Sequence, residues 1–540
     1  MSDQDPPLTA AQKRAAHPEF LPTFSLPAIQ DQLPFCYPVP EGIAPSPKRQ
    51  YRSNYRYLGW QELADPQALA HFSLFEVALR LVDFSPLRDL LAQHYRPSNK
   101  GQIPFDPVSL FLLLCLRAEL RLSWRKTAQL IAGQHGARWR RLFGFEAGDT
   151  PSESGLRYFR DAVGTDTFQE CCALFIDLLR REELVAERST YPGDPPDRGV
   201  TISHDIMLHE ARSNMRCAYV TDSCYQPRPR DCPAQAQGQQ GCDCSEARCA
   251  ESCHLTTPLD SEARLIHYDG RNKYGDLPPR PSERGRNVYG YASNPDRLVD
   301  DRFACAWTLR TDLLPANVDE RTIFPDSFAK LRQRFPDLRI GEVLGDAALG
   351  YTNCLQVIWD AGAIRMIDIR AAANDEDVET CRKRGYNGHG HPVCVFGYPM
   401  RLNGYDYQRR RGKWCCEKAC LKALPDGSSP LRPQQECDYL GEEHIHGQVV
   451  NVGLTLPDGS MRLAREVPYG TAAWKRRYAR RSLSESRNGS VESLGHKRLS
   501  SYGQTRGRKD IILDDVLINF QTLGRLVSQA TRLALAPDTS

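Results

Sequence analysis

The sequence predicts an α/β core that carries an all-α N-terminal domain and is interrupted by a β-rich insertion. Apolar residues recur every three or four positions from about residue 64 to residue 187, the spacing of helices that bury one face. Two runs, at 200–205 and 339–346, each indicate a strand that delivers an aspartate. Residues 371–470 are instead rich in glycine, aromatic residues and short alternating runs. A chain of 540 residues has room for several such units.

The domain boundaries follow from these changes in composition. A Pro-, Gly- and Asp-rich stretch at 190–199 is a natural linker between the helical region and the core. We expect a Pro-rich basic and aromatic arm at 1–63, a helical domain at 64–189, the first part of the core at 190–370 with a Cys-rich insertion at 217–254, a β-rich insertion at 371–470, and the last part of the core with a C-terminal helix at 471–540.

The arm at 1–63 ends in a cluster of arginines and tyrosines, in the sequence PSPKRQYRSNYRYLGW. Arginines can neutralise phosphates and tyrosine rings can stack on bases, so such an arm is suited to lie on DNA. A solvated linker is the alternative reading of the same composition.

The helical domain shows two clear helix starts. Asp106-Pro107 and Ser123-Trp124 pair an N-cap residue with a good first helical position. The segments at 123–145 and 152–184 could together form a helix-turn-helix. Its arginines are expected to face outward: Arg138, Arg140, Arg141, Arg157 and Arg160.

The core region offers three acids in the order strand, strand, helix. Asp205 lies in the strand-like VTISHDIML, and Asp346 follows the strand RIGEVLG. An aspartate at the C-terminal end of a strand points into the crevice where α/β sheets bind ligands, although Asp346 would serve equally well as a helix N-cap. Later elements are a helix at PDSFAKLRQRF, a strand at 364–370 and an amphipathic helix at 510–535 that packs on the sheet.

The third acid, Glu485, lies in a strongly basic stretch. From Thr471 to Lys509 there are eleven lysines and arginines against two acids, Glu485 and Glu492. If the stretch from Trp474 to Lys497 is helical, Glu485 shares one face with the residues four and seven positions before it, Arg481 and Tyr478. A carboxylate among so many cations suits a site where metal ions meet a polyanion; an exposed helix with an Arg481–Glu485 pair is the plainer reading.

Composition limits the function classes further. The net charge is only +3, so binding to a polyanion must come from local clusters. The N-terminus lacks a signal peptide, and the apolar run from Val108 to Leu116 is too short to span a membrane. We therefore expect an intracellular protein without a membrane partner. Its nineteen cysteines then favour thiols or metal sites over disulfides.

Two cysteine sets are candidates for structural zinc. Paired thiolates close in sequence build tetrahedral zinc sites, and the insertion at 217–254 contains two such pairs. A flexible insertion with free thiols is the alternative. A second set of cysteines and histidines lies within 389–446. The predicted zinc ligands are Cys242, Cys244, Cys249 and Cys253.

The motifs around the acids resemble those of bacterial insertion-sequence transposases of the DDE type, in the group with a Tyr-Arg-Glu-Lys signature. Tyr478, Arg481 and Glu485 have that group's spacing, and GDAALGY resembles its second-aspartate motif. SWRKTAQLI and SGLRYFR resemble phrases of its helical domain. The chain departs from the pattern at Glu492, where the group has lysine, and at Ile206, where it has glycine. Glu492 and Asp222 thus stay open as alternatives to Glu485 and Asp205.

The resemblance implies a ribonuclease-H-like catalytic core and a helical domain that binds the element's ends. Asp205, Asp346 and Glu485 would be catalytic and would bind two Mg²⁺ ions. The activity would be cleavage at transposon ends and strand transfer into target DNA by a homodimer, in the bacterial cytoplasm at the nucleoid. The partners would be terminal inverted repeats and target DNA, contacted by Tyr478, Arg481, Lys497, Arg476, Arg477, Arg138, Arg140 and Arg141.

Two other functions stay open at the level of sequence. One is a non-catalytic, zinc-containing DNA-binding protein derived from a transposase, which the missing lysine and glycine allow. The other is a general Mg²⁺-dependent nuclease that cuts DNA without recognising particular ends.

Overall fold

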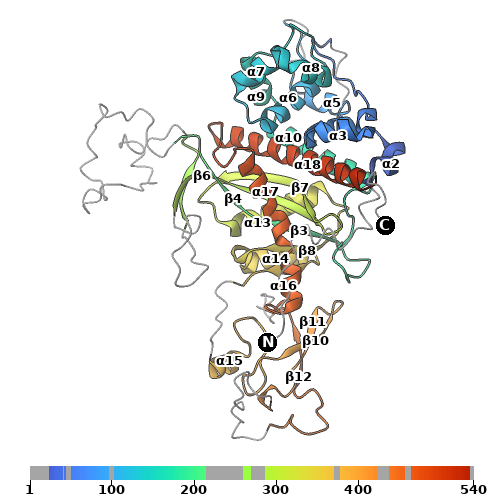
Figure 1. Ribbon diagram of the computed structural model, residues 1–540. Coiled ribbons are helices and arrows are strands. Elements are labelled where there is room, and N and C mark those ends of the chain that lie inside the picture. The colour runs from blue at the N-terminus through green and yellow to red at the C-terminus, as the bar shows by residue number, and fades with distance from the viewer. Residues whose placement is uncertain are drawn as a thin grey trace, which may run out of the picture. The chain divides into compact units, whose positions relative to one another are not determined.

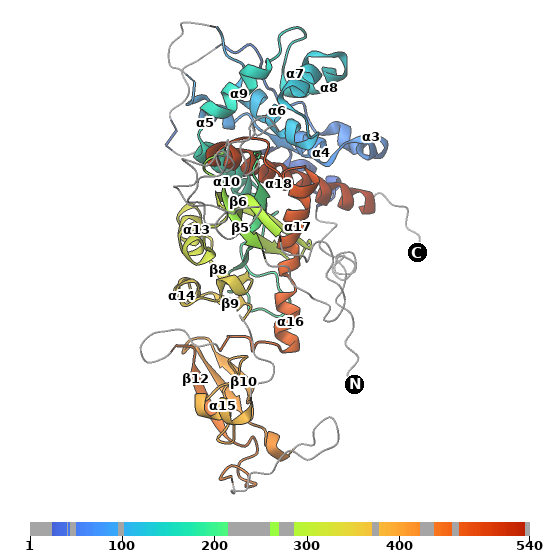
Figure 2. The same cartoon turned by 90° about the vertical axis from the view of Figure 1, so that its left-hand side faces the viewer.

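The computed structural model divides into two compact units (Figures 1 and 2). The first unit comprises Met1–Ala186, Asp205–Val318 and Leu483–Ser540, and the second comprises Glu187–His204 and Asp319–Ser482. Within them the structure describes residues 24–39, 42–43, 50–95, 102–213, 260–268, 286–369, 377–421, 437–455 and 464–534.

The N-terminal part of the first unit is helical, and its predicted helix starts are confirmed. The Asp106 carboxylate accepts a hydrogen bond from the Val108 N–H (3.0 Å), and the Ser123 hydroxyl accepts one from the Lys126 N–H (3.3 Å). Both side chains satisfy N–H groups that have no partner inside the helix. The helices are α2 (Leu26–Ile29), α3 (Pro66–His71), α4 (Leu74–Leu81), α5 (Leu87–Ala92), α6 (Pro107–Glu119), α7 (Trp124–Ala132), α8 (Ala137–Phe143), α9 (Glu153–Ala162) and α10 (Thr165–Arg181).

The described end of the N-terminal arm packs on these helices, contrary to both readings of it as an extended segment. Tyr55 is buried, and the Tyr57 hydroxyl donates to the carbonyl of Arg80 (2.5 Å). Arg52 forms an ion pair with Asp149. Tyrosine rings bury a large apolar area while their hydroxyls still find partners, so this cluster serves the fold.

The strands of the first unit form an antiparallel arrangement around β6 (Arg286–Asp300). β6 pairs with β4 (Met207–Glu210), β5 (Arg264–Tyr268) and β7 (Cys305–Pro315). The strands expected near 287–294 and 303–311 are thereby confirmed. A short parallel pair, β1 (Phe35–Cys36) and β2 (Val82–Asp83), lies apart from them.

The long helix α18 (Gln504–Ala534) lies between the N-terminal helices and this sheet (Figures 1 and 2). It packs on β7 with one side and on α4, α6 and α10 with the other. The expected helix at 510–535 therefore begins earlier, and several of its polar side chains are buried. Asp514 and Asp515 are buried, which requires partners inside the unit.

The second unit contains three parallel strands, β3 (Val200–His204), β8 (Ile340–Gly345) and β9 (Ile364–Ile367). Helices α13 (Glu320–Arg334) and α14 (Thr352–Asp360) pack on each other. α13 begins at its N-cap Asp319, before the start expected near Pro325. Proline lacks the N–H that would bond the Arg321 carbonyl, and the Asn353 side-chain amide donates to that carbonyl instead (2.7 Å).

The predicted β-rich stretch forms a small antiparallel sheet of β10 (Arg401–Asp406), β11 (Arg411–Cys415) and β12 (Val449–Gly453), with helix α15 (Val378–Arg384) before it. The segment 393–400, which alternates like a strand, is a loop that turns at Gly397 (φ +83°). Its Cys394 packs with Met400, Trp414 and Cys416 in a core of this subdomain.

Among the described helices, none combines the length and apolar character needed to cross a membrane.

Candidate active site

The ends of the three parallel strands place acidic residues at equivalent positions. In the register of β3 and β8, Ser203 lies opposite Leu344, and in that of β8 and β9, Gly345 lies opposite Ile367. Asp205 comes directly after β3, Asp346 directly after β8, and Asp368 directly after β9. Parallel strands end at the same edge of a sheet, and this edge is where α/β folds bind ligands.

Asp346 caps the short 3₁₀ turn η7 (Ala347–Leu349), as its N-cap interpretation predicts. Its carboxylate accepts a hydrogen bond from the Ala348 N–H (2.8 Å), while the side chain stays half-buried. A side chain at Gly345 before it would require its neighbours to shift, since an added Cβ would lie 2.5 Å from Leu349 Cδ1 and 2.9 Å from Ile367 Cδ1. Asp346 can cap η7 and still lie at the end of the strand, which is the edge where α/β folds bind ligands.

Asp368 is an acid that sequence reasoning missed. Its carboxylate accepts hydrogen bonds from the Tyr469 hydroxyl (2.6 Å) and the Ile369 N–H (2.9 Å). Burial raises the pKa of Tyr478 to about 12; Arg481 lowers it, and the charges of Asp368 and Asp346 raise it further. The negative charges of both acids therefore disfavour ionisation of the Tyr478 hydroxyl. The signal in the sequence was an aspartate directly after the apolar run IRMI.

The signature residues Tyr478 and Arg481 lie at a break between two helices. α16 (Ala472–Tyr478) ends at the tyrosine, and α17 (Arg481–Ser493) begins at the arginine, so the expected continuous helix is interrupted. The pair stays in contact, with the Arg481 guanidinium 3.5 Å from the Tyr478 hydroxyl. The Tyr478 ring stacks on Trp474, with centroids 4.4 Å apart.

Arg477 is buried and does not face a ligand, which corrects its assignment as a DNA contact. It forms ion pairs with Asp194 (2.6 Å) and with Glu342 of β8, whose side chain is fully buried. These carboxylates raise the pKa of Arg477 even though burial opposes it. Arg480 also pairs with Glu342 and donates to the Thr201 hydroxyl (2.8 Å). Both arginines fasten α16 to β3 and β8.

The neighbouring cations Lys475 and Arg476 are exposed, and in the described part of the chain neither forms an ion pair. The prediction that Arg476 contacts DNA thus stays open. Other cations of this stretch, such as Arg477 and Arg480, instead form ion pairs inside the protein.

Glu485 lies exposed on α17, and Asn488 is one helical turn further on. The Asn488 amide donates to the Asp205 carboxylate (2.9 Å). Residues three positions apart share a helix face, so Glu485 lies on the side of α17 that approaches Asp205. The first unit therefore brings the first and third predicted acids to one region.

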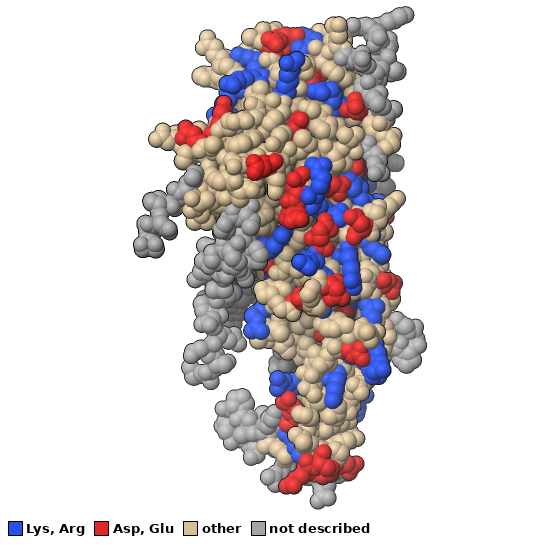
Figure 3. Space-filling model, turned by 90° about the vertical axis from the view of Figure 1, so that its right-hand side faces the viewer, with Lys and Arg blue, Asp and Glu red and all other residues tan. Residues whose placement is uncertain are grey.

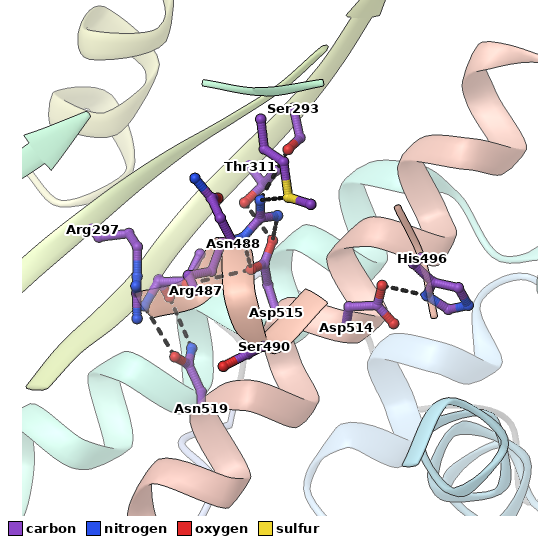
Figure 4. A network of polar contacts seen from close by, with 12 residues as sticks. Ser293, Arg297, Thr311, Arg487, Asn488, Ser490, His496, Asp514, Asp515 and Asn519 are labelled. Carbon is purple, nitrogen blue, oxygen red and sulfur yellow. Dashed lines mark hydrogen bonds and ion pairs between the residues drawn. The ribbon is translucent and has the colours of Figure 1, made fainter. Parts of the chain in front are cut away.

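Buried polar contacts fix the rotation of α17 (Figure 4). Arg487 pairs through Nε and Nη2 with both carboxylate oxygens of Asp515 on α18 (2.8 and 2.9 Å), and its Nη1 donates to the Ser293 hydroxyl (2.9 Å). Arg297 donates to the carbonyl of Ser484 (2.7 Å). Since Arg487 points into the core, Asn488 is directed toward Asp205.

The alternative acid, Glu492, has a different environment. Its exposed carboxylate pairs with Lys497 (2.6 Å), the nearest lysine to the position where the signature expects one. An exposed pair of this kind contributes at most about 1 kcal/mol, so it leaves both side chains available to a ligand.

The arginines of the helical domain divide into exposed and structural ones. Arg141 is exposed, and Arg138 is half-exposed while pairing with Glu76 (2.5 Å). Arg140 donates to the carbonyls of Ile131 (2.7 Å) and Gly133 (2.6 Å), which satisfies the C-terminal end of α7. Arg160, expected to face outward, is buried and bonds Ser501 and Asp161.

The structure describes the predicted magnesium ligands but not the predicted zinc ligands. Carboxylate oxygens are the donors that Mg²⁺ prefers, so the chemistry of Asp205, Asp346 and Glu485 fits this ion. Over the ranges that the structure describes, no three His, Cys, Asp or Glu side chains converge closely enough to hold a metal ion. The convergence of the three acids stays a prediction. The predicted zinc ligands, Cys242, Cys244, Cys249 and Cys253, lie outside the described residues.

In the second Cys/His set, several groups serve the packing of the β-rich subdomain. Burial, followed by the neighbouring His389, lowers the pKa of His391 to about 4. The neutral ring bonds the carbonyl of Tyr469 through Nε2 (3.0 Å) and packs beside Trp414. Burial likewise raises the pKa of Cys394, so this thiol stays protonated.

Residues 67–162, from α3 to the end of α9, match the family model described as Transposase domain (DUF772). A comparison with curated proteins finds no match for the chain. The family match supports a transposase family, and with it an enzyme that processes DNA and binds it.

Proposed function

We propose that this protein is a DDE transposase with a ribonuclease-H-like core, which cleaves DNA at transposon ends and transfers the strand into target DNA. Asp205, Asp346 and Glu485 are its catalytic acids. The observation that carries the proposal is the strand register, which aligns the positions directly after β3 and β8, and hence Asp205 and Asp346. The order strand-Asp, strand-Asp, helix-Glu is the one this core requires.

Three further observations support the arrangement. The Asn488 amide bonds Asp205 from the same face of α17 that carries Glu485. Buried ion pairs fix α16 within the second unit, through Arg477, and α17 within the first unit, through Arg487. The transposase-domain match covers the helical domain, outside the proposed catalytic acids, so it supports the family independently of them.

The reaction consists of two phosphodiester exchanges. Water attacks the phosphorus at the transposon end, the P–O3′ bond breaks, and a free 3′-hydroxyl and a 5′-phosphate result. That 3′-hydroxyl then attacks a target phosphodiester, which joins the strands and releases a target 3′-hydroxyl. Two bound Mg²⁺ ions, held by the three carboxylates, would supply activation of the attacking oxygen and stabilisation of the leaving one.

The chain's own residues position the reactants. Asn488 orients the Asp205 carboxylate through its hydrogen bond. Tyr478 lies close enough to Asp346 for that charge to raise its pKa, and it contacts Arg481. Both residues and the exposed Arg476 on α16 are suited to hold the DNA backbone by charge and hydrogen bonds. Because two ends must be joined to a target, we propose that the active form is a homodimer.

The test is strand cleavage of a plasmid that carries the inverted repeats flanking the coding region, with Mg²⁺. Wild type is compared with Glu485→Gln and, as the matched control seven residues along the same helix, Glu492→Gln. We expect nicking and strand transfer to vanish only in Glu485→Gln, with DNA binding retained in both variants.

Loss of activity in Glu492→Gln alone would instead assign the third acid to Glu492. A wild-type protein that binds the ends but never cuts with any divalent metal would be a DNA-binding protein. Cutting that is indifferent to the repeats would identify a general nuclease.

A further inference from the structure

An arginine-lined cleft opens in the first unit. It has a volume of about 670 Å³ and lies between helices α6, α7 and α9 and the segment that follows α17. One acid, Glu153, lines it. The face in Figure 3 shows acidic and basic side chains interspersed, in keeping with the net charge of +3, so a cluster of this composition is a local feature. Its arginines are Arg117, Arg121, Arg125, Arg157, Arg212 and Arg498.

The floor of the cleft is a buried cation that the protein only partly satisfies. Arg117 is 5% exposed, lies 4.0 Å from the centre of the Trp124 ring and donates to the Ser500 hydroxyl (3.1 Å). Its Nε has no hydrogen-bond partner among the described residues. Burial lowers the pKa of Arg117; the acids Asp510 and Asp514 oppose this effect, whereas Arg160 and Arg157 add to it. A buried, under-satisfied cation is costly unless a ligand compensates it.

Other guanidinium groups gather around the same indole. Arg160 lies 4.8 Å and Arg157 5.7 Å from the centre of the Trp124 ring. Stacking on an aromatic face restrains a guanidinium group while its N–H groups stay available at the edge. Arg157 retains one partner, the partly exposed Glu153 (2.7 Å).

The rim carries cations without internal partners. Arg121 and Arg125 are exposed, and neither takes part in an ion pair in the portion of the chain that the structure describes. They flank Ser123 and Trp124, where α7 begins, and the positive end of the helix dipole adds to their field. On the opposite side, Arg498 donates to the carbonyls of Ala211 (3.2 Å) and Arg212 (2.9 Å), which ties that wall together.

We propose that this cleft binds the phosphodiester backbone of double-stranded DNA. The inference rests on the proposed function, because it supplies a holding site for the DNA that the acids cleave. A single small anion would not need six arginines from five segments of the chain, whereas a backbone presents a row of phosphates over that span. Guanidinium groups are the side chains best suited to bind phosphate oxygens in pairs.

The distance along α17 from Glu485 to the cleft indicates which phosphates the cleft would bind. Leu494, at its edge, is nine residues after Glu485, which corresponds to roughly 14 Å along α17 and its end. At about 3.4 Å per nucleotide of one strand, this is about four nucleotides. For a DNA strand that runs along α17, the cleft would contact phosphates about four nucleotides from the cleaved bond.

The test measures affinity for a random-sequence duplex of about 30 base pairs, three helical turns, by fluorescence anisotropy over a salt series in EDTA. The variant Arg121→Gln/Arg125→Gln removes two rim charges without touching an internal ion pair. The matched control, Arg382→Gln/Arg409→Gln, removes two exposed arginines of the second unit. Thermal unfolding of each variant verifies folding.

Each phosphate contact contributes about 0.9 to the slope of log K against log salt, so the rim variant should lose about 1.8 (0.9 × 2). At 0.1 M salt this corresponds to binding up to about sixtyfold weaker. The control should keep the wild-type slope. Equal slopes in the rim variant and wild type would overturn the proposal for this cleft.

The measurement is independent of cleavage, since no metal is present. A wild-type protein without affinity for DNA would refute the cleft and the proposed transposase together. A reduced slope in the rim variant of a protein that never nicks its ends would support the cleft and count against the proposed catalytic function alone.

Discussion

Replacement of Arg487 by methionine is expected to destabilise the first unit severely. The Arg487 side chain is fully buried and makes two hydrogen bonds to Asp515, whose side chain is 1% exposed. In the variant, Asp515 keeps the Thr311 hydroxyl (2.6 Å) and the more distant Thr308 hydroxyl (3.4 Å) as donors (Figure 4). Two hydroxyl groups do not replace a positive charge, so the buried carboxylate loses its ion-pair partner and keeps only the charge of the nearby Arg297.

The magnitude follows from this burial. Removal of one partner of a buried ion pair costs about 3–5 kcal/mol. That is a large part of the roughly 5–15 kcal/mol by which a domain is stable. The double variant Arg487→Met/Asp515→Leu removes both charges of this pair, and we expect it to be more stable than Arg487→Met alone. As a control, Lys330→Met breaks the exposed pair with Asp326 and should change stability by at most about 1 kcal/mol.

The assay is hydrogen exchange read by mass spectrometry in urea, followed in peptides from β7 and α18. These peptides report the first unit alone, so unfolding of the second unit does not enter the result. Equal protection in Arg487→Met and wild type would refute the reasoning. So would a double variant that loses the sum of both single effects, because the two side chains would then not interact.

Two further predictions concern the groups around α17. His209 is fully buried between the His496 carbonyl (2.8 Å) and the Ser293 hydroxyl (2.8 Å), and burial, then the charge of Arg487, lowers its pKa to about 3. The unfolded chain takes up this proton near pH 6.5. The free energy of unfolding should therefore fall between pH 6.5 and pH 3, by up to about 1.4 kcal/mol per pH unit. Urea titrations of His209→Asn should show a weaker pH dependence of this free energy, and an unchanged pH dependence would contradict the assignment. Asn488→Ala removes the hydrogen-bond donor to Asp205. The Mg²⁺ concentration for half-maximal nicking should rise about tenfold, while the affinity for DNA stays unchanged. An unaltered Mg²⁺ titration would show that Asn488 does not belong to the site.

The sequence by itself determined the features that depend on neighbouring residues. Asp106 and Ser123 begin helices because each side chain bonds an N–H two or three positions later. The strands before Asp205 and Asp346 follow from short apolar runs, which are local patterns as well. Candidate acids could therefore be named, since residue type and strand position are both visible in the chain.

The tertiary structure decided which charged side chains stay exposed to a ligand and which form ion pairs inside the protein. Arg477 and Arg160 resemble their exposed neighbours in sequence, yet each is buried beside acids that lie far away along the chain. The partners of Asp515 on α18 come from α17 and β7, so its burial has no local signal either. Asp368 joins the acidic strand ends only through the register of β8 and β9. Desolvation makes each of these charges depend on a partner in space, and such partners are set by packing between distant segments.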